Sequence, residues 1–545
     1  MKIIIVGGVA GGAGTAARLR RMDENAEIIV FERGKHLSFA NCGLPYYIGG
    51  TIEDRNSLFV VKNQLFADRF DIDVRPEQEV LSVDVDKKTV TVRDLVSGKE
   101  YRESFDKLVL SPGASPVKPQ IKGVESNRIF TLKNIPDADN IKEFIIQHKV
   151  KKAVVVGAGF IGLEMVENLH NMGVDVTLVE MQNRVMTTLD FSMAAIVHAH
   201  LKQKNVNLVL SKCVNEFEEK DGQLFVGLDN GDTLCTDIAI LSIGVRPETR
   251  LAKEAGIEIG TLGGIKINEY MQTSNPGIYA LGDAVEVIHP ITGQPALIPL
   301  AGPANKQARI VADNIVFGNT AKYKGSYGVC IAKLFDLTVA SAGANAKMLK
   351  ESGIEYISSY THSASHATYY PGAKQMSIKI MFSPASGELY GAQIVGFDGV
   401  DKRMEMLAGV IRYGGTVQDL CELEQAYAPP YSSAKDPVNM AGFVADNILT
   451  GKMKIAHWRS VTDDDFKLDV RTPKEFSEGH IQGSINIPLD DLRGRMGELP
   501  KTGRIVVNCA IGLRSYIACR ILIQNGFKDV VNLSGGYKTY STATA

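Results

Sequence analysis

A glycine-rich turn between two apolar segments restricts the fold of this 545-residue chain more than any other feature. Residues 2–6 are almost entirely apolar, as buried parallel strands are. The turn 7–12 follows and opens a predicted helix, and the next strand, 28–31, ends at Glu32. Glycines let the backbone approach a pyrophosphate, which binds at the positive end of the helix. The arrangement predicts a dinucleotide-binding βαβ unit, in which Glu32 accepts hydrogen bonds from a ribose.

The same pattern recurs in the middle of the chain. The apolar segment 153–156 leads into the turn 157–162, and the strand 174–179 ends at Glu180. An acid at this position favours the free 2′-hydroxyl of NADH, whereas NADPH prefers an arginine. Because Arg184 lies nearby, use of NADPH stays open. Two such units predict two dinucleotides, a flavin that stays bound and a nicotinamide that visits.

The expected cofactor contacts are the turn residues of both units and the acids that follow them: Gly7, Val9, Gly12, Glu32, Gly157, Gly159, Gly162 and Glu180. The second turn has all three glycines of the G-x-G-x-x-G pattern. In the first turn Val9 replaces the middle glycine. The interpretation of the first copy therefore depends on its position between two strands and on Glu32.

Segment 273–283 ends in Gly282-Asp283 and resembles the second FAD motif of the two-dinucleotide flavoprotein disulfide reductases. In that family the acid binds the ribityl chain, so Asp283 would contact FAD. Segment 242–247 resembles the return from the NAD domain to the FAD domain. The resemblance implies an α/β, glutathione reductase-like fold with two Rossmann-like domains. An NAD-binding domain would be inserted into an FAD-binding domain, with bounds 116–245 for the first and 1–115 and 246–322 for the second.

Composition restricts the class of protein. With 45% hydrophobic and 22% charged residues and a formal net charge of −2, the chain is typical of a globular protein that binds neither nucleic acid nor a membrane. Seven cysteines without a C-x-x-C pair favour a reducing cytoplasm and one or two functional thiols. His362 and His366 have the i, i+4 spacing of metal ligands. Because no third ligand is evident, they are predicted to lie at a surface or interface, and no metal is expected.

Cys42 lies in the segment SFANCGLPYY, a short loop after the first βαβ unit. No second cysteine is near it along the chain, so a second sulfur for thiol chemistry must come from outside. A positive site or helix N-terminus is expected to lower its pKa, and a small packed core residue is the alternative. The segment resembles the single-cysteine branch of these reductases, most closely the coenzyme A-disulfide reductases. The resemblance makes Cys42 the redox-active nucleophile, alternating between a thiolate and a mixed disulfide with coenzyme A.

Related NADH oxidases and peroxidases also use one cysteine, which cycles through sulfenic acid. They typically have a histidine in the first glycine turn, where this chain has Ala10. The difference argues against peroxide or oxygen chemistry.

The predicted contacts to coenzyme A are Arg18, Arg21, Ser38, Asn41 and Lys435, of which Lys435 resembles a coenzyme-contacting lysine of the family. Ser38 and Asn41 would contact the pantetheine arm. Arg18 and Arg21, three residues apart on one helix face, would bind the phosphates, and a solvated basic face is an equal alternative. Phe70 stands where some family members have a basic residue, so part of the phosphate-binding surface is unassigned.

Residues 323–450 contain no nucleotide motif and resemble the family's α+β dimerisation domain, which implies a homodimer. Strands are predicted at 377–382 and 389–395. Tyr369 and Tyr427 match the two tyrosines that the family brings to the partner subunit's cysteine. A phenol there can donate a proton to a leaving thiolate, although tyrosines also pack in interfaces.

A linker near 451–456 leads to a C-terminal α/β domain, residues 457–545. Its loop Cys509-x-x-Gly-x-Arg-Ser opens a helix, and the backbone N–H groups of such a loop stabilise an anionic sulfur. With the segments 469–471 and 479–484, this loop resembles the rhodanese sulfurtransferases. The resemblance makes Cys509 the carrier of sulfane sulfur and Arg514 its stabiliser. Cys519 is interpreted as a packing residue.

The fusion of a thiol reductase to a sulfur-carrying domain favours reduction of sulfane sulfur. The hypothesis is that NADH reduces FAD and that FADH2 reduces a Cys42–coenzyme A mixed disulfide. The freed thiolate then attacks a coenzyme A persulfide or polysulfide and releases hydrosulfide, while Cys509 exchanges sulfur with a donor or with coenzyme A. Two alternatives stay open: reduction of coenzyme A disulfide to maintain a thiol pool, and a rhodanese that only binds or senses sulfur.

Overall fold

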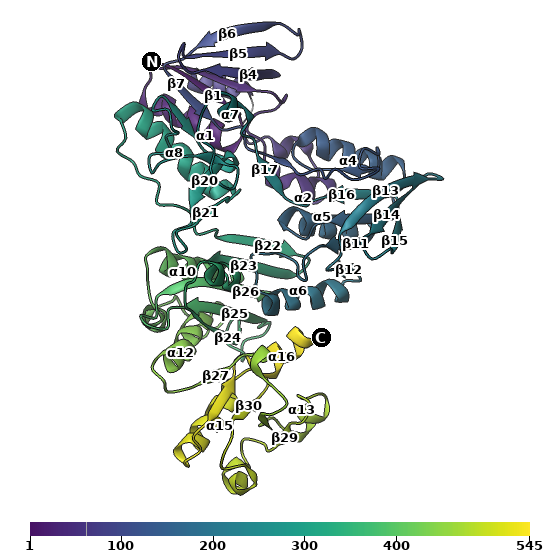
Figure 1. Cartoon of the computed structure of the whole chain (residues 1–545), viewed down its shortest axis with the longest axis vertical. Helices are drawn as coiled ribbons and strands as arrows, with labels where there is room; N and C mark the ends of the chain where they lie inside the picture. Colours follow the sequence, from purple (N-terminus) through teal and green to yellow (C-terminus); the bar gives the residue numbers. More distant parts are fainter. Residues whose placement is uncertain (62) are drawn as a thin grey trace. The chain divides into compact units, whose positions relative to one another are not determined.

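The computed structural model describes residues 1–61 and 63–545. The chain divides into two compact units, which are described separately. Unit 1 comprises Met1–Gln182 and Val206–Gly328, and unit 2 comprises Asn183–Asn205 and Val329–Ala545. Both units combine helices with β-sheets (Figure 1). This organisation confirms the predicted α/β class.

The first sheet of unit 1 is parallel and has the strand order β19-β7-β1-β2-β3. Its strands are β1 (Lys2–Val6), β2 (Glu27–Glu32), β3 (Asp73–Pro76), β7 (Lys107–Leu110) and β19 (Ile278–Ala280). The central strand β1 lies between β2 and β7, and its apolar residues are buried. Helices α1 (Ala10–Met22) and α8 (Ala301–Phe317) pack against each other at this sheet (Figure 1).

The second sheet is also parallel, with the order β12-β11-β10-β16-β9. Its strands are β9 (Ile129–Phe130), β10 (Lys152–Val156), β11 (Asp175–Glu180), β12 (Asn207–Leu210) and β16 (Ile238–Leu241). Helix α5 (Phe160–Asn171) follows β10 as α1 follows β1, and α4 (Ile135–Gln147) follows β9. Both predicted βαβ units are therefore present.

Shorter elements complete unit 1. Strands β8 (Ala114–Pro116) and β17 (Val245–Pro247) pair antiparallel at the two predicted passages between the FAD and NAD domains. The helices are α2 (Leu44–Ile48), α3 (Asn63–Phe70) and α7 (Arg250–Glu254). The remaining strands are β4 (Gln78–Asp84), β5 (Thr89–Asp94), β6 (Glu100–Ser104), β13 (Val214–Lys220), β14 (Gln223–Leu228), β15 (Thr233–Thr236), β18 (Ile265–Lys266), β20 (Val285–Ile288) and β21 (Pro295–Ala296).

The first sheet of unit 2 is antiparallel, with the order β22-β23-β26-β25-β24. Its strands are β22 (Cys330–Leu334), β23 (Leu337–Gly343), β24 (Ile357–Ala364), β25 (Gln375–Phe382) and β26 (Leu389–Gly396). The predicted strands 377–382 and 389–395 are parts of β25 and β26. The helices are α6 (Phe191–Gln203), α9 (Ala346–Glu351), α10 (Val400–Arg412), α11 (Val417–Glu422) and α12 (Pro437–Leu449).

The C-terminal sheet is parallel, with the order β27-β31-β30-β28-β29. Its strands are β27 (Ile455–Ala456), β28 (Phe466–Asp469), β29 (Ile485–Asn486), β30 (Ile505–Asn508) and β31 (Val530–Leu533). Residues 455 and 456, predicted to lie in a linker, instead form the edge strand β27. The reason is tertiary, since β27 exists only through its pairing with the distant strand β31. The helices are α13 (Pro473–Ser477), α14 (Leu492–Arg495), α15 (Leu513–Gln524) and α16 (Gly536–Thr544).

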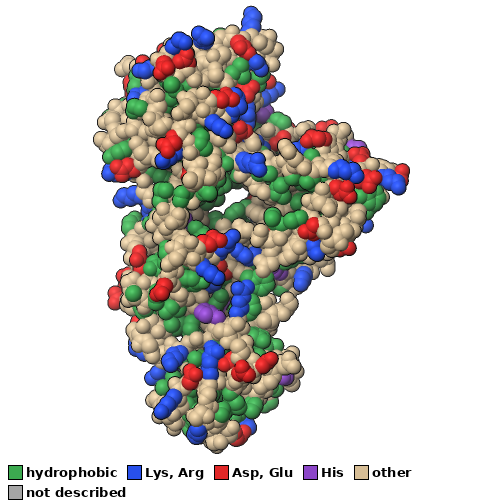
Figure 2. Space-filling model, in the orientation of Figure 1, with side chains coloured by type: hydrophobic (Ala, Val, Ile, Leu, Met, Phe, Trp, Pro, Cys, Tyr) green, Lys and Arg blue, Asp and Glu red, His purple; other side chains and the backbone are tan. Residues whose placement is uncertain are grey.

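Acidic and basic side chains are interspersed over the face of the molecule drawn in Figure 2. Such mixing accords with the small formal net charge of −2. Among the described residues, no helix combines the length and the apolar character that crossing a membrane requires.

Candidate active sites

The two glycine turns of unit 1 are built alike. Gly7 and Gly157 have φ values of +99° and +98°, and a Cβ atom there would lie 2.1 and 2.4 Å from a neighbouring carbonyl oxygen. A Cβ at Gly12 or Gly162 would lie 1.8 or 2.0 Å from the carbonyl oxygen that begins its own turn. These four positions therefore require glycine, for backbone conformation or for close packing of the helix.

The copies differ at the middle position of the turn. Val9 has φ −97° and Gly159 has φ −78°, values that any residue can adopt. A Cβ at Gly159 would meet no atom of the described residues within 4 Å, which leaves space for a ligand at the backbone. In the described part of the chain, neither α1 nor α5 has a side-chain cap at its N-terminus. Their first N–H groups are thus available to an anion.

The acid after each second strand stabilises its own turn. Glu32 accepts hydrogen bonds from the N–H groups of Gly8 and Gly34, at 2.8 and 2.7 Å. Glu180 accepts hydrogen bonds from the N–H groups of Ala158, in its turn, and of Gln182, at the same distances of 2.8 and 2.7 Å. A carboxylate has about four acceptor positions, so each acid can also bind ribose hydroxyls.

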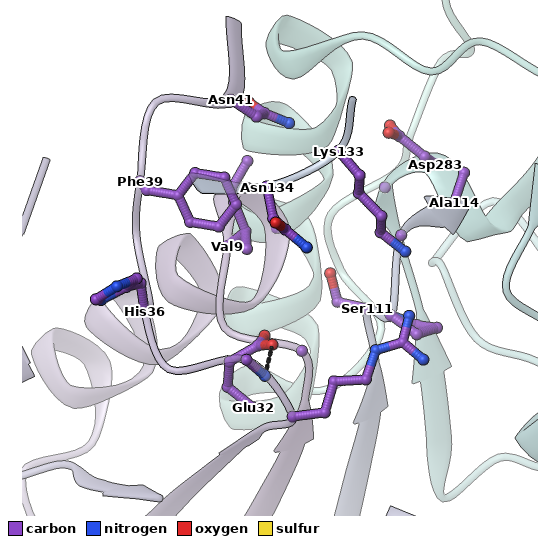
Figure 3. A pocket seen from close by; sticks show the side chains of 18 of the residues that line it. Val9, Glu32, His36, Phe39, Asn41, Ser111, Ala114, Lys133, Asn134 and Asp283 are labelled. Atoms are coloured by element: carbon purple, nitrogen blue, oxygen red, sulfur yellow. Dashed lines mark hydrogen bonds between the residues drawn. The ribbon is translucent and has the colours of Figure 1, made fainter. Parts of the chain in front are cut away.

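A cavity of about 240 Å³ lies beside the first turn (Figure 3). Gly7, Val9 and Glu32 line it, and Lys133 and Asp283 project into it from other segments (Figure 3). Burial raises the pKa of the Asp283 carboxyl. Glycines that admit a close approach, an uncapped helix and a cation fit the diphosphate of a dinucleotide such as FAD.

Lys133 is a cavity residue that the sequence analysis missed. Its Nζ donates to Ser115 Oγ at 2.7 Å and lies 3.5 Å from the carboxylate of Glu248. Burial, followed by repulsion from Arg33, lowers the pKa of Lys133. No motif marks this lysine, since its cavity is assembled from distant segments.

Cys42 lies in the helical turn Asn41–Gly43, directly before α2, and is exposed. Its N–H donates to Asn41 Oδ1 at 3.2 Å. Desolvation raises the pKa of the Cys42 thiol, and the carboxylates of Glu164 and Asp283 add to this effect. The expectation of a pKa lowered by the protein is therefore wrong, because the charged side chains that act on the thiol are acidic.

Tyr46 and Glu164 form a second feature that the sequence analysis missed. The Tyr46 hydroxyl donates to Glu164 Oε1 at 3.3 Å, which joins α2 to α5. Burial raises the pKa of Glu164 to about 7, although the hydrogen bond from Tyr46 opposes the shift. A carboxyl that titrates near neutral pH thus acts on the candidate nucleophile. The available signal was the spacing of Tyr46, one helical turn after Cys42.

The residues proposed for coenzyme A lie in different settings. Arg18 pairs with Asp313 of α8, with its Nε 2.8 Å from the carboxylate. Arg21 is exposed, as are Asn41 and, in unit 2, Lys435. Ser38 is half-buried and donates its N–H to the Gly8 carbonyl at 2.9 Å. The two arginines, predicted as one phosphate-binding face, therefore differ, because Arg18 is already neutralised.

In unit 2 the two predicted tyrosines meet. The hydroxyl groups of Tyr369 and Tyr427 lie 2.8 Å apart, although the residues are 58 positions apart in the sequence. Tyr369 is 75% exposed and Tyr427 is 47% exposed. The hydrogen bond raises the pKa of the Tyr369 phenol. The two phenols therefore form one accessible, hydrogen-bonded pair.

Cys509 lies at the end of β30, in the loop that opens α15, and is 1% exposed. The Gly512 N–H donates to its sulfur at 3.1 Å. The Ser515 hydroxyl is 3.4 Å from the sulfur and 2.7 Å from Asn532 Oδ1, so its single hydrogen serves one acceptor at a time. The loop thus directs donors at the sulfur, as an anionic persulfide requires.

Arg514, the predicted stabiliser of this sulfur, is bound to Glu475. Its Nη1 and Nη2 lie 2.8 and 2.6 Å from the two carboxylate oxygens, a bidentate pair. The Arg514 guanidinium lowers the pKa of Glu475 to about 2. Glu475 also accepts from the N–H of Thr472 at the start of α13. Arg514 is therefore fixed at the rim of the loop by a partner that the sequence analysis did not identify.

His362 and Cys519 are both buried and have packing or hydrogen-bonding roles. His362 is buried between Ser377 Oγ, 2.8 Å away, and Thr539 Oγ1, 2.9 Å away. It thus joins β24 to α16, in line with the predicted interface position. Desolvation lowers the pKa of His362 to about 3. Cys519 is fully buried in the core of the C-terminal domain, as predicted.

Comparison with known families identifies the parts of the chain. The model described as pyridine nucleotide-disulphide oxidoreductase matches residues 1–305. The chain belongs to this family. The family's dimerisation domain matches residues 329–437, and a rhodanese-like domain matches residues 458–543. This oxidoreductase is therefore an enzyme with a rhodanese domain, as predicted.

Three relatives show how much of this oxidoreductase is shared with known proteins. A coenzyme A disulfide reductase of Staphylococcus haemolyticus is 36% identical over 447 residues, which cover 82% of this chain and 100% of the relative. The solved structure of reduced CoADR-RHD from Bacillus anthracis is 49% identical, with a TM-score of 0.97, and covers 99% of this chain and 98% of that chain. An NAD-dependent persulfide reductase from A. fulgidus is 39% identical, with a TM-score of 0.94, and covers 99% and 100%.

Proposed function

We propose that this oxidoreductase reduces the sulfane sulfur of coenzyme A persulfide or polysulfide to hydrosulfide, with NADH as the electron donor. The observation that carries the proposal is the combination of two thiols: the exposed Cys42, whose neighbour Asn41 lines the dinucleotide cavity, and Cys509, whose sulfur accepts a hydrogen bond from the Gly512 N–H. All seven cysteines lie in the described part of the chain, and each is a free thiol. A disulfide at Cys42 therefore needs a sulfur from the substrate.

The relatives support this choice of substrate. The Staphylococcus relative is named for coenzyme A disulfide and is matched by 82% of this chain. The A. fulgidus relative, named for persulfide, is matched along 99% of this chain. The proposal takes coenzyme A from the first name and persulfide from the second, and the rhodanese domain of this chain favours persulfide.

The proposed reaction balances as coenzyme A persulfide + NADH → coenzyme A + NAD⁺ + HS⁻. The Cys42 thiolate attacks the sulfur that is bonded to coenzyme A, breaks the S–S bond, and releases HS⁻. A Cys42–coenzyme A disulfide remains. Bound FAD would supply the path by which the electron pair of NADH reaches this disulfide. Cys42 then returns as a thiolate, and coenzyme A leaves as a thiol after taking up one proton.

The residues of unit 1 determine how Cys42 ionises. Because Glu164 and Asp283 oppose a second negative charge, the thiolate is favoured when Glu164 holds a proton. Glu164 titrates at about 7, so it can take up this proton at neutral pH. Ser38, Asn41, Arg21 and Lys435 are the proposed contacts of coenzyme A, with Arg18 contributing only if Asp313 releases it.

The tyrosine pair supplies the proton for the leaving coenzyme A thiolate. The dimerisation domain supports a homodimer, in which Tyr369 and Tyr427 would reach the Cys42 of the second copy. Their exposure supports this role, since a phenol pair at 75% and 47% exposure is open to a second molecule.

Cys509 exchanges sulfane sulfur with a donor or with coenzyme A. A persulfide on Cys509 is an anion, and the Gly512 N–H at 3.1 Å is positioned to stabilise it. The charge of Arg514 is paired with Glu475, so Arg514 would stabilise the persulfide only if Glu475 releases it. The C-terminal domain would thereby provide the coenzyme A persulfide that Cys42 consumes.

A second candidate function is reduction of coenzyme A disulfide itself, to maintain the coenzyme A thiol pool. It is favoured by the relative that ends before the rhodanese domain and is named for this activity. The same Cys42–coenzyme A disulfide serves both reactions, so the substrates distinguish them.

NADH oxidation by the purified holoenzyme, measured separately with coenzyme A persulfide and with coenzyme A disulfide, tests the proposal. We expect kcat/KM to be at least tenfold higher for the persulfide, with one HS⁻ released for each NADH. A higher value for the disulfide would replace the proposed function with the second candidate. The identity of the thiol bound to Cys42 gives an independent check, since reductant should release one coenzyme A per chain.

A further inference from the structure

Arg403 is the largest fully buried side chain in the described part of the chain, at 1% exposure. It lies in the first turn of α10, and its partner Asp436 is also 1% exposed. Its Nε and Nη2 lie 3.1 and 2.8 Å from Asp436 Oδ2. Burying two charges costs free energy of desolvation, so a function of this ion pair has to be sought.

The Arg403 guanidinium joins three segments of unit 2. Its Nη2 also donates to the Ser365 carbonyl at 2.8 Å and lies 3.2 Å from Ser432 Oγ. The Ser432 hydroxyl donates to Asp436 Oδ2 at 2.5 Å. The Ser432 carbonyl accepts from the Ala367 N–H at 3.0 Å. The residues around 365–367 and 432–436 are thus joined through one buried group, which we call the Arg403 clamp.

The joined segments carry the two tyrosines. Tyr369 follows Ala367 by two residues, in the connection between β24 and β25. Tyr427 precedes Ser432 by five residues, and the Ser432 N–H donates to the Ala428 carbonyl at 3.2 Å. Each tyrosine therefore lies a short stretch of chain away from the clamp.

Energetics favours a positioning role for this clamp. Desolvation offsets most of the attraction in a buried ion pair, and apolar replacements are often equally stable, so stability alone does not explain it. The hydroxyl pair of Tyr369 and Tyr427 is exposed, and water competes for both groups. A single hydrogen bond in water is too weak to order two loops. The two loops that carry the tyrosines therefore need a rigid attachment to the rest of the domain, and the Arg403 clamp provides one.

We propose that Arg403 is a positioning residue, which holds the hydroxyl groups of Tyr369 and Tyr427 together by joining their loops through Ser365, Ser432 and Asp436. The inference deepens the proposed function, in which this pair protonates the leaving thiolate. The guanidinium is needed because its planar fork reaches several acceptors at fixed angles, whereas the lysine ammonium is a point charge.

The test is Arg403→Lys in the full-length holoenzyme with 3-fluorotyrosine incorporated. Fluorine NMR follows the titration of each phenol, with Tyr369→Phe and Tyr427→Phe assigning the two signals. In the parent protein Tyr427→Phe should lower the pKa of Tyr369, because their hydrogen bond raises it. In the Arg403→Lys background, Tyr427→Phe should leave the Tyr369 titration unchanged.

Turnover gives the second readout. Arg403→Lys should lower kcat by about the same factor as Tyr369→Phe, roughly a hundredfold or more, with KM nearly constant. The double variant should be no slower than either single variant, since both remove the same function. If Tyr369→Phe leaves kcat unchanged, the tyrosine pair is not the proton donor of the proposed function. The NMR titration would still decide whether Arg403 positions the two tyrosines.

Lys379→Met is the matched control. Lys379 is another buried cation of unit 2, 4% exposed and 2.7 Å from Asp190, outside the tyrosine segments. Lys379→Met should lower the melting temperature, as Arg403→Lys does. In the Lys379→Met background, however, Tyr427→Phe should still lower the pKa of Tyr369. Retention of the coupling in Arg403→Lys, or its equal loss in Lys379→Met, would overturn the proposal.

Discussion

The two candidate thiols, Cys42 and Cys509, lie in opposite environments. Cys42 is exposed, and the carboxylates of Glu164 and Asp283 act on it. Cys509 is 1% exposed, and the Gly512 N–H is directed at its sulfur. The protein thus supplies stabilisation for an anion at Cys509 but opposes one at Cys42. The comparison teaches that similar thiols differ in how their surroundings act on a negative charge, because the fold places different groups around each of them.

The largest expected effect separates the two thiols directly. Cys42→Ser should reduce NADH-dependent sulfide release from coenzyme A persulfide by roughly 10³-fold or more, because the nucleophile is lost. Sulfur transfer from thiosulfate to cyanide, measured on the same variant, should stay within twofold of the parent protein because it depends on Cys509. Retained sulfide release would remove Cys42 from the mechanism.

The reciprocal change should produce a smaller loss in the overall reaction. Cys509→Ser should abolish thiosulfate-to-cyanide transfer, while NADH oxidation with coenzyme A disulfide stays within twofold. NADH-dependent sulfide release from thiosulfate with catalytic coenzyme A should fall by roughly 10²-fold, because the proposed sulfur carrier is missing. If sulfide release is unchanged with every donor, the rhodanese domain binds or senses sulfur without catalysis.

A change at Glu164 sharpens the electrostatic side of the comparison. Glu164 raises the pKa of Cys42, so Glu164→Gln should lower it and increase the thiolate fraction at neutral pH. The rate of Cys42 alkylation by iodoacetamide, measured against pH, should have its midpoint at a lower pH, so that alkylation near pH 7 becomes faster. Glu100→Gln, on the exposed strand β6, is the control and should not move the midpoint.

The smallest effect concerns the ion pair at the Cys509 loop. Glu475 and Arg514 side chains are each 33% exposed, so Glu475→Gln should lower the free energy of unfolding by only about 0.5 kcal/mol at pH 7. The folded pKa of Glu475, about 2, lies below the usual value of about 4.3. Its contribution is therefore present above about pH 4.3 and is lost as the pH falls toward 2.

Denaturant unfolding of the wild type and Glu475→Gln at pH 7 and pH 3 measures this contribution. The difference between the two proteins should shrink at the lower pH. Glu498→Gln removes the exposed pair with Arg495 in the same domain and serves as the control. An equal difference at both pH values would contradict the assigned pKa.

The sequence by itself determined the features that depend on local backbone conformation. Gly7 and Gly157 were identified because a turn with φ near +99° admits glycine and few other residues. The strands that flank these turns were predicted because apolar runs of this length are typical of buried parallel strands. The Cys509 loop was identified because successive backbone N–H groups at a helix N-terminus stabilise an anionic sulfur, and in the structure the Gly512 N–H donates to it.

Only the tertiary structure decided which side chains and strands pair with each other and how the pKa of Cys42 is shifted. Arg18 and Arg21 were predicted to lie on the same face of one helix, and the sequence does not distinguish them. In the structure Arg18 pairs with Asp313, which is 295 positions away in the sequence. The short strand β27 exists only through its pairing with β31. The raised pKa of Cys42 comes from desolvation and from acids on other segments. Backbone conformation depends on the nearest residues along the chain, whereas desolvation and Coulomb interactions depend on the nearest atoms in space.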